Sequence, residues 1–316
     1  MTKRMRGNLF LLLAAFIWGV AFVAQSEGMK YVEPFTFTGI RSCLAGIALL
    51  ACLGIRRFLE KRRKNGAPGI TAAKEADNKA AEDGKERKAS VRVLFLGGIC
   101  CGIVLFTATM LQQTGIKYVP EPGKAGFITA LYIVLVPVCG IFTKKRPGIR
   151  VWLAVLLASA GMYLLCITDG FTIARGDSYL LLCAAAFTGH ILVVDYFSPK
   201  ADGVAMSCIQ FFVCGILGTA GMLLTEQVQI AQILKAWLPL VYAGVLSGGV
   251  GYTLQIVAQK DTEPEVASLL MSLESVFAVL GGLVLLGQVL TIRETLGCAL
   301  VFAAVLLAQL RKRNGQ

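Results

Sequence analysis

Some ionisable side chains stand deep inside long apolar runs of the sequence, among them Glu274, Arg41 and His190. Glu274 is about ten residues into its run, which places it about 15 Å deep in a helix that rises about 1.5 Å per residue. A charge at that depth costs about 2.5–3.5 kcal/mol on insertion scales, so a chain keeps one there for a reason. We therefore predict that Glu274 carries a coupling proton or contacts a substrate. A protonated carboxyl that makes only an interhelical hydrogen bond is the alternative.

By the same count, Arg41 lies about 12 Å below the outer surface. It could bind an anionic group there or pair with an acidic side chain, or it could pack against a neighbouring helix or extend its charge outward. His190 is the only histidine and lies about eleven residues into its run. Imidazole can titrate near neutral pH, but polar residues in bundles also simply bond to a neighbouring helix. Both interpretations stay open for each residue.

The composition is that of a membrane protein. Of the 316 residues, 56% are hydrophobic and 16% are charged, against roughly 45–50% and about 25% in soluble domains. The net charge of +12 comes from Lys and Arg between the apolar runs, so nucleic acid is not an expected partner. The ten cysteines lie in apolar runs without a Cys-x-x-Cys pair. With a single histidine, neither a metal site nor a cofactor is predicted.

Ten segments are long and apolar enough to cross a bilayer as helices, which takes about 20 residues. They are 9–26, 34–55, 91–111, 123–143, 151–168, 179–198, 204–225, 237–258, 266–287 and 293–310. We therefore predict an all-α membrane protein with ten transmembrane helices. Most of the 31 Lys and Arg residues fall in loops on the side of both termini, which predicts cytoplasmic termini in a multi-pass protein of the plasma (inner) membrane. Membrane lipids are expected partners, and a homodimer is left open.

Residues 56–91 form the one long hydrophilic stretch. It begins with a basic cluster, Arg56, Arg57 and 61–64, that can contact anionic lipid headgroups. It continues as charged residues, Ala and Gly without apolar periodicity. We predict a mobile cytoplasmic loop here.

The two halves of the chain resemble each other. At nearly constant spacing, once 56–91 is set aside, Leu111-Gln112 matches Leu254-Gln255, Glu121-Pro122 matches Glu263-Pro264, and Ile40-Arg41 matches Ile209-Gln210. The matches predict two five-helix repeats, 8–168 and 177–311. Because five is odd, the second repeat enters the membrane from the opposite side. Inverted repeats are typical of alternating-access carriers that hold the solute near the midplane.

The repeat adds further candidate site residues. Tyr132 is the counterpart of Glu274 and is also polar-tipped near the midplane. Gln112 and Gln255 are counterparts, one near the outer end of the third helix and one near the inner end of the eighth. Their placement suits gates on opposite faces, and ordinary interhelical hydrogen bonds explain it as well. Pro137 predicts a kink in the fourth helix.

Several short runs form an ordered set along the chain. They are Ala14-Ala15-Phe16-Ile17-Trp18-Gly19, Arg41, 125–132 with Val136-Pro137, Gln255 with Ala258-Gln259-Lys260, Leu273-Glu274, Gly281-Gly282, Leu286-Gly287 and Gly297. This set resembles the EamA-type carriers of the drug/metabolite transporter superfamily, over nearly the whole chain except 56–91. The resemblance implies a cavity lined by the first, third, fourth, sixth, eighth and ninth helices, which Trp18 would face. Ser275 departs from the family's proline, and Gln288 from its acidic residue.

No Gly-x-x-x-x-Gly-Lys-Ser/Thr motif for ATP is present. We therefore predict a secondary active transporter that exports a small organic metabolite, such as an amino acid or a related compound, by alternating access. A proton is the expected coupling ion. The alternative, an intramembrane lipid-modifying enzyme, needs His, Asp or Ser groups clustered at one depth. A channel needs a polar stripe along several helices. The sequence favours neither, and an enzyme is not expected.

Overall fold

The computed structural model describes residues 3–65, 76–119, 122–142, 147–166, 175–286 and 291–309. Within these ranges the chain forms helices and short turns, without a strand. Among the described residues, eight helices are long and apolar enough to cross a membrane: Met5–Gly28, Pro34–Arg62, Val91–Tyr118, Lys124–Phe142, Arg175–Lys200, Gly203–Thr225, Trp237–Gln259 and Pro264–Val284. Ile149–Leu164 is apolar but shorter. The all-α membrane class is confirmed, and the count of ten helices stays a prediction.

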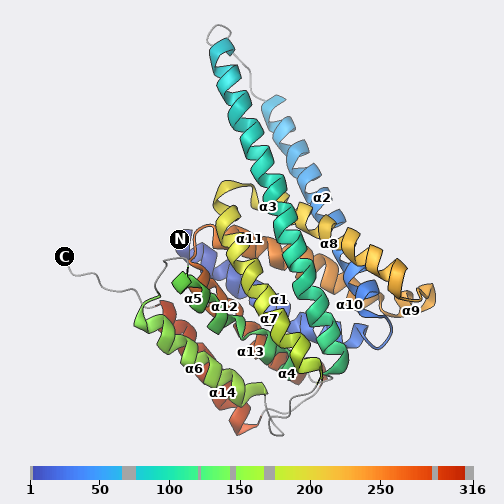
Figure 1. Ribbon diagram of the computed structural model, residues 1–316, viewed down its shortest axis with the longest axis vertical. Coiled ribbons are helices and arrows are strands. Elements are labelled where there is room, and N and C mark those ends of the chain that lie inside the picture. The colour runs from blue at the N-terminus through green and yellow to red at the C-terminus, as the bar shows by residue number, and fades with distance from the viewer. Residues whose placement is uncertain are drawn as a thin grey trace, which may run out of the picture.

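The helices form one bundle (Figure 1). The first half holds α1 (Lys3–Gly28), α2 (Pro34–Asn65), α3 (Ala76–Tyr118), α4 (Pro122–Thr129), α5 (Tyr132–Phe142) and α6 (Ile149–Cys166). The second half holds α7 (Arg175–Phe197), η1 (Ser198–Lys200), α8 (Gly203–Thr225), α9 (Ile230–Lys235), α10 (Trp237–Val241), η2 (Tyr242–Tyr252), α11 (Thr253–Gln259), α12 (Pro264–Met271), α13 (Leu273–Leu286) and α14 (Ile292–Gln309). α2 packs against α8, α3 against α7, α6 against α14, and α1 against α13 and η2.

Much of the stretch predicted as a loop is helical. α2 continues to Asn65 and α3 begins at Ala76, and both project beyond the bundle (Figure 1). The loop prediction for 56–91 is therefore wrong for 56–65 and 76–91, while 66–75 lies outside the described residues. The physical reason is that Ala, Lys, Glu and Arg are good helix formers. A helix that has already formed in the bundle can extend without the free-energy cost of forming a new helical nucleus.

Two membrane helices are broken into two pieces near their middle. α4 ends at Thr129 and α5 starts at Tyr132, while α12 ends at Met271 and α13 starts at Leu273. Pro137 lies inside α5, beyond the break, so the interruption does not depend on proline. Irregular backbone at membrane depth occurs where it is buried in protein or lines a cavity.

A third irregular segment lies between α10 and α11. There the 11 residues of η2 wind as a wider, π-type helix, a form often found at functional sites. Nε1 of Trp18 in α1 donates a hydrogen bond of 3.2 Å to the Ser247 carbonyl of η2. Gly251 permits this approach, because a Cβ there would lie 2.6 Å from Nε1 of Trp18.

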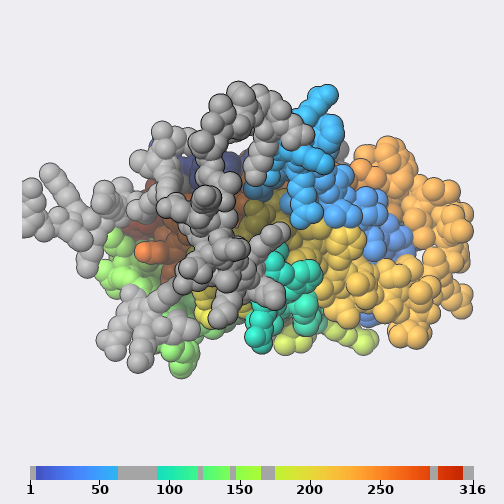
Figure 2. Space-filling model, turned by 90° about the horizontal axis from the view of Figure 1, so that it is seen from above, coloured from blue at the N-terminus to red at the C-terminus, as the bar shows by residue number. Residues whose placement is uncertain are grey.

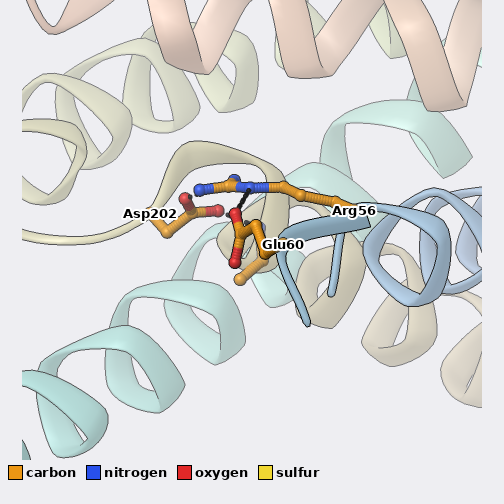
Figure 3. A network of polar contacts seen from close by, with 4 residues as sticks. Arg56, Glu60 and Asp202 are labelled. Atoms are coloured by element: carbon orange, nitrogen blue, oxygen red, sulfur yellow. Dashed lines mark hydrogen bonds and ion pairs between the residues drawn. The ribbon is translucent and has the colours of Figure 1, made fainter. Parts of the chain in front are cut away.

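The α2–α8 pair is fastened at the end from which α2 projects. Arg56 of α2 donates to Asp202 at 3.0 Å and to Glu60 at 3.1 Å (Figure 3). Asp202 also accepts from the backbone N–H of Ala205 at 2.9 Å, which caps the start of α8. Figure 2 looks down on this face, where α2 (light blue) lies beside the yellow segment that contains Asp202. One carboxylate thus caps α8 and binds α2.

The opposite end of the pair is fastened by Glu226, which follows α8 directly. Its carboxylate accepts hydrogen bonds of 2.7 Å from the backbone N–H groups of Phe35 and Thr36 and from the Thr36 hydroxyl. The N–H groups at a helix start have no partner within the helix, and a negative charge there is favourable. α2 and α8 are therefore antiparallel and tied together at both ends.

Candidate functional site

A cavity lies inside the bundle and is lined by α1, α2, α3, α4, α5, α7, η2, α11, α12 and α13. Its lining residues are Trp18, Ala21, Phe22, Gln25, Arg41, Gln112, Thr129, Tyr132, Phe187, Ile191, Ser247, Tyr252, Gln255, Met271 and Glu274. The space open to water is about 30 Å³, which holds about two water molecules. Binding of an organic solute would require the surrounding helices to move apart.

Glu274 and Tyr132 stand at the two helix breaks. Glu274 lies in the first turn of α13 and Tyr132 is the first residue of α5. The Tyr132 hydroxyl donates a hydrogen bond of 2.9 Å to Oε1 of Glu274, and both side chains are buried. The start of a helix carries partial positive charge, which favours a carboxylate at that position. The break in α12–α13 thus places the carboxyl at a helix start, where its charged form costs less than it would in the middle of an unbroken helix.

Arg41 is the basic group of the cavity. Nη1 donates to Oε1 of Gln25 at 3.1 Å, and the guanidinium lies 5.6 Å from the centre of the Phe37 ring. Its side chain is 7% exposed, so the charge does not extend to the surface. Guanidinium has five N–H donors, and across the described residues no carboxylate pairs with it. The group therefore keeps donors free for an anionic partner.

An aromatic wall faces these two charged groups. The Trp18 and Tyr252 rings lie 4.7 Å apart between centroids, and Phe211 packs behind Tyr252 at 5.6 Å. Phe22 and Phe187 also line the cavity. Aromatic walls with a few placed polar groups are typical of sites for small organic molecules.

Comparison with known proteins places the chain in a family. The EamA-like transporter family matches it twice, over residues 5–167 and 174–310. The chain belongs to the EamA-like transporter family. It is therefore a multi-pass membrane transporter, and the family points away from an enzyme.

Two curated relatives span nearly all of this EamA-like transporter. An "Uncharacterized transporter" of Archaeoglobus fulgidus is 27% identical over 318 residues, covering 98% of this chain and 87% of the relative. The "Uncharacterized transporter YwfM" of Bacillus subtilis is 27% identical over 320 residues, covering 98% and 97%. A solved crystal structure shares the fold with a TM-score of 0.71 at 19% identity, covering 96% of this chain and 98% of that one.

Most of the side chains singled out in the sequence meet in the cavity of this EamA-like transporter. They are Glu274, Tyr132, Arg41, Gln112, Gln255 and Trp18. Gln112 and Gln255, predicted as gates on opposite faces, both line this cavity, and their role as gates stays a prediction. Gln255 also donates to Gln259 at 2.9 Å. Gln288 lies outside the described residues, whereas Ser275 is buried beside the α12–α13 break.

His190 is not among the cavity-lining residues. Its ring lies behind Tyr252 at 5.8 Å between centroids, and its Nε2 is 3.3 Å from Oε1 of Gln210 in α8. Within the part of the chain that the structure describes, Nδ1 of His190 and Nε2 of Gln210 are buried without a hydrogen-bond partner. The contact agrees with the interhelical bond offered as the structural interpretation, and a role in coupling stays a proposal.

Four polar lining residues of this EamA-like transporter were not singled out in the sequence: Gln25, Thr129, Ser247 and Tyr252. One of them could have been found. Tyr252 precedes Gln255 by three positions, and residues at that spacing share a helix face. The others carry no charge; Thr129 and Ser247 stand in apolar runs, and Gln25 precedes Ser26 and Glu27 at the end of its run, so only packing reveals them.

Proposed function

We propose that this EamA-like transporter is a secondary carrier that exports a zwitterionic, amino-acid-like metabolite in exchange for protons. The observation that carries the proposal is that one guanidinium, Arg41, and one carboxyl, Glu274, line the same cavity from different halves of the chain. They are not paired with each other. A solute with both charges would satisfy both groups.

Arg41 suits the solute's carboxylate, because guanidinium and carboxylate form two parallel hydrogen bonds. Glu274 suits the solute's ammonium group, with Tyr132 holding the carboxyl in position. The wall formed by Trp18 and Tyr252 suits an apolar or aromatic remainder. The two charged residues would thus recognise the carboxylate and ammonium groups of the solute, and the aromatic wall would recognise its side chain.

Proton exchange follows from the same arrangement. In the empty carrier Glu274 holds a proton; an arriving ammonium group takes its place, and the proton leaves to the water on the cytoplasmic side. After the solute departs outside, Glu274 takes a proton there and returns. Each cycle moves one solute out and one proton in, so the proton gradient drives export.

Alternating access would come from two inverted five-helix halves, 8–168 and 177–311. α1, α2, α3, α4–α5 and α6 would correspond to α7, α8, α10–α11, α12–α13 and α14. The two family matches, 5–167 and 174–310, support this division. So does the packing, because α2 meets its counterpart α8 and α6 meets its counterpart α14. The charge distribution of the loops supports cytoplasmic termini in the plasma membrane.

Counterflow in proteoliposomes tests the proposal. Vesicles preloaded with single amino acids, the matching amines or the matching carboxylic acids are tested for uptake of the labelled compound. We expect counterflow of at least one amino acid and of neither matching singly charged analogue. Glu274→Gln should abolish proton-driven accumulation. Transport of the amine or the acid alone, or proton-driven accumulation in Glu274→Gln, would contradict it.

A further inference from the structure

A second, open cleft lies on the surface close to the cavity. It is bordered by Pro147 and Gly148 before α6 and by the α11–α12 turn, and Asp195, Gln259, Lys260 and Asp261 are among its lining residues. It offers about 600 Å³, against about 30 Å³ in the cavity. Gly7 near the N-terminus packs against Thr262 in the same turn. We call this the inner cleft, since it opens on the face of the N-terminus.

Two neighbouring turns of α11 separate the inner cleft from the cavity. Gln255 lines the cavity and Gln259, one turn further along, lines the inner cleft. Both side chains are only 2% exposed. The wall between the two spaces is thus no thicker than one helical turn and the side chains packed on it.

The wall is held together by a chain of amide hydrogen bonds. Nε2 of Gln255 donates to Oε1 of Gln259 at 2.9 Å, and Nε2 of Gln259 donates to the carbonyl of Ile191 in α7 at 3.2 Å. Ile191 itself lines the cavity. Gln259 therefore joins α11 to α7 where the two spaces come nearest to each other.

The chemistry of this chain suits a contact that opens and closes. Neutral amides exchange protein partners for water at a small net cost. Among the described residues, Oε1 of Gln255 is buried without a hydrogen-bond partner, so water or a solute that enters would satisfy an acceptor left unpaired in the closed arrangement. A hydrogen bond between groups that were all satisfied in the closed arrangement would gain no new partner from opening.

We propose that Gln259 is the latch that closes the cavity toward the inner cleft, and that solute enters the cavity from the cytoplasm through this cleft. The direction of entry rests on the proposed function; the latch itself does not. When Gln259 releases Ile191, α7 and α11 separate and the two spaces become one. Asp261 and Glu263, which line the cleft, then favour the approach of solutes that carry an ammonium group.

Trp18 provides a reporter that needs no solute. The chain has three tryptophans, so replacing Trp152 and Trp237 by Phe leaves Trp18 alone in the cavity. Quenching of its fluorescence by acrylamide then measures how often water reaches the cavity. Gln259→Met keeps the length of the side chain and removes both hydrogen bonds.

The matched control lies on the same helix. Thr253→Val removes one interhelical bond, from Thr253 to Ser207 at 2.8 Å, without touching the wall. Loss of the latch bonds shifts the ratio of open to closed forms by roughly tenfold. We expect the quenching constant to rise about twofold or more in Gln259→Met and to stay unchanged in Thr253→Val.

An equal quenching constant in the two variants would overturn the latch. Sealed vesicles that hold the protein with its termini outward test on which side the cavity opens, because external iodide then reaches Trp18 only from that side. If Gln259→Met raised quenching only from the opposite face, that result would also overturn the latch. If Gln259→Met does not fold, Gln259→Asn leaves the amide too short for its partners and carries the same expectation. If quenching rises in Gln259→Met but no amino acid shows counterflow, the proposed solute class is contradicted and the latch is not.

Discussion

The hydroxyl of Tyr132 lies 2.9 Å from Oε1 of Glu274, so the starts of two broken-off helix pieces, α5 and α13, are joined by one buried hydrogen bond. The two residues are 142 positions apart, and each follows a break in its own membrane helix. The bond fixes the carboxyl at the meeting point of the halves. A change in the protonation or occupancy of Glu274 therefore acts directly on the contact between α5 and α13.

Tyr132→Phe should lower kcat/KM for the transported solute roughly tenfold or more, because a hydrogen bond to a charged group is worth about 1.5–3 kcal/mol. Initial rates of counterflow measure the effect. Tyr242→Phe is the control, since it removes a hydroxyl that donates to the Ile17 carbonyl at 3.0 Å outside the cavity lining. Similar losses in the two variants would show that Tyr132 acts only through the packing of the bundle.

Arg41→Gln should abolish the preference for solutes with a carboxylate. In wild type, the methyl ester of the transported amino acid should compete poorly in counterflow. In Arg41→Gln, ester and acid should compete about equally, because the guanidinium that distinguishes them is gone. Arg41→Lys should recover only part of the preference, since an ammonium group cannot form the two parallel bonds. An unchanged preference in Arg41→Gln would assign the residue to packing alone.

Gly251→Ala should destabilise the protein by about 1–3 kcal/mol, the usual cost of overpacking, and should reduce counterflow. The added Cβ would lie 2.6 Å from Nε1 of Trp18 and would push the indole away from Ser247. Gly189→Ala serves as the control, because its Cβ would meet nothing nearer than Val104 at 3.5 Å. Thermal unfolding in detergent compares the two, and equal melting temperatures would contradict the close approach of Trp18 to η2.

Asp202→Ala should lower stability by about 1 kcal/mol, the usual value of a helix cap, in a pH-dependent way. Burial alone would raise the pKa of Asp202, but hydrogen bonds from the Ala205 N–H and Arg56 outweigh it and hold the pKa below its ordinary value. A lowered pKa stabilises the fold above the unfolded value of about 3.9, and this is lost as the pH falls through the folded value.

The difference in melting temperature between wild type and Asp202→Ala should therefore be full at pH 7 and shrink below about pH 4. Asp202→Asn keeps a side-chain oxygen that can cap α8 but removes the ion pair with Arg56, so this variant separates the two contributions. Exposed ion pairs are worth about 0–1 kcal/mol. A difference that does not change with pH would show that the carboxylate's charge contributes nothing.

The sequence indicated which polar side chains are buried in the bundle, but not the direction in which each one points. Glu274 and Arg41 were found because a charge in an apolar run is costly, and Tyr132 because the repeat pairs it with Glu274. His190 lies at a similar depth, but its side chain points behind Tyr252 rather than into the cavity. Its rotation about the helix depends on which faces pack together, and α7 shows too weak an apolar stripe to reveal that.

The helix breaks were also beyond the sequence. Thr129 and Ser272 border the interruptions, yet neither is a residue that breaks helices by itself, and the one proline noticed, Pro137, lies within α5. Such breaks are stable only because neighbouring helices satisfy and surround the irregular backbone. The helical parts of 56–91 were missed for the opposite reason: an apolar stripe was demanded where helix propensity and an anchored start were enough.

The α2–α8 pair carries a charged fastening at each end, Arg56–Asp202 and Glu226 on the start of α2. α8 has 23 residues, which span about 35 Å, close to the hydrocarbon thickness of about 30 Å. We therefore expect the two charged contacts to lie at the two boundaries between lipid and water, so that the length of the pair matches the thickness of the bilayer. In lipids with shorter or longer chains the bilayer must adapt to the fixed length of this pair, while the two broken helices, which pack on α1, α6 and α7 instead, can tilt to match. Lipid chain length should thus alter the rate of the transport cycle more than the stability of the fold.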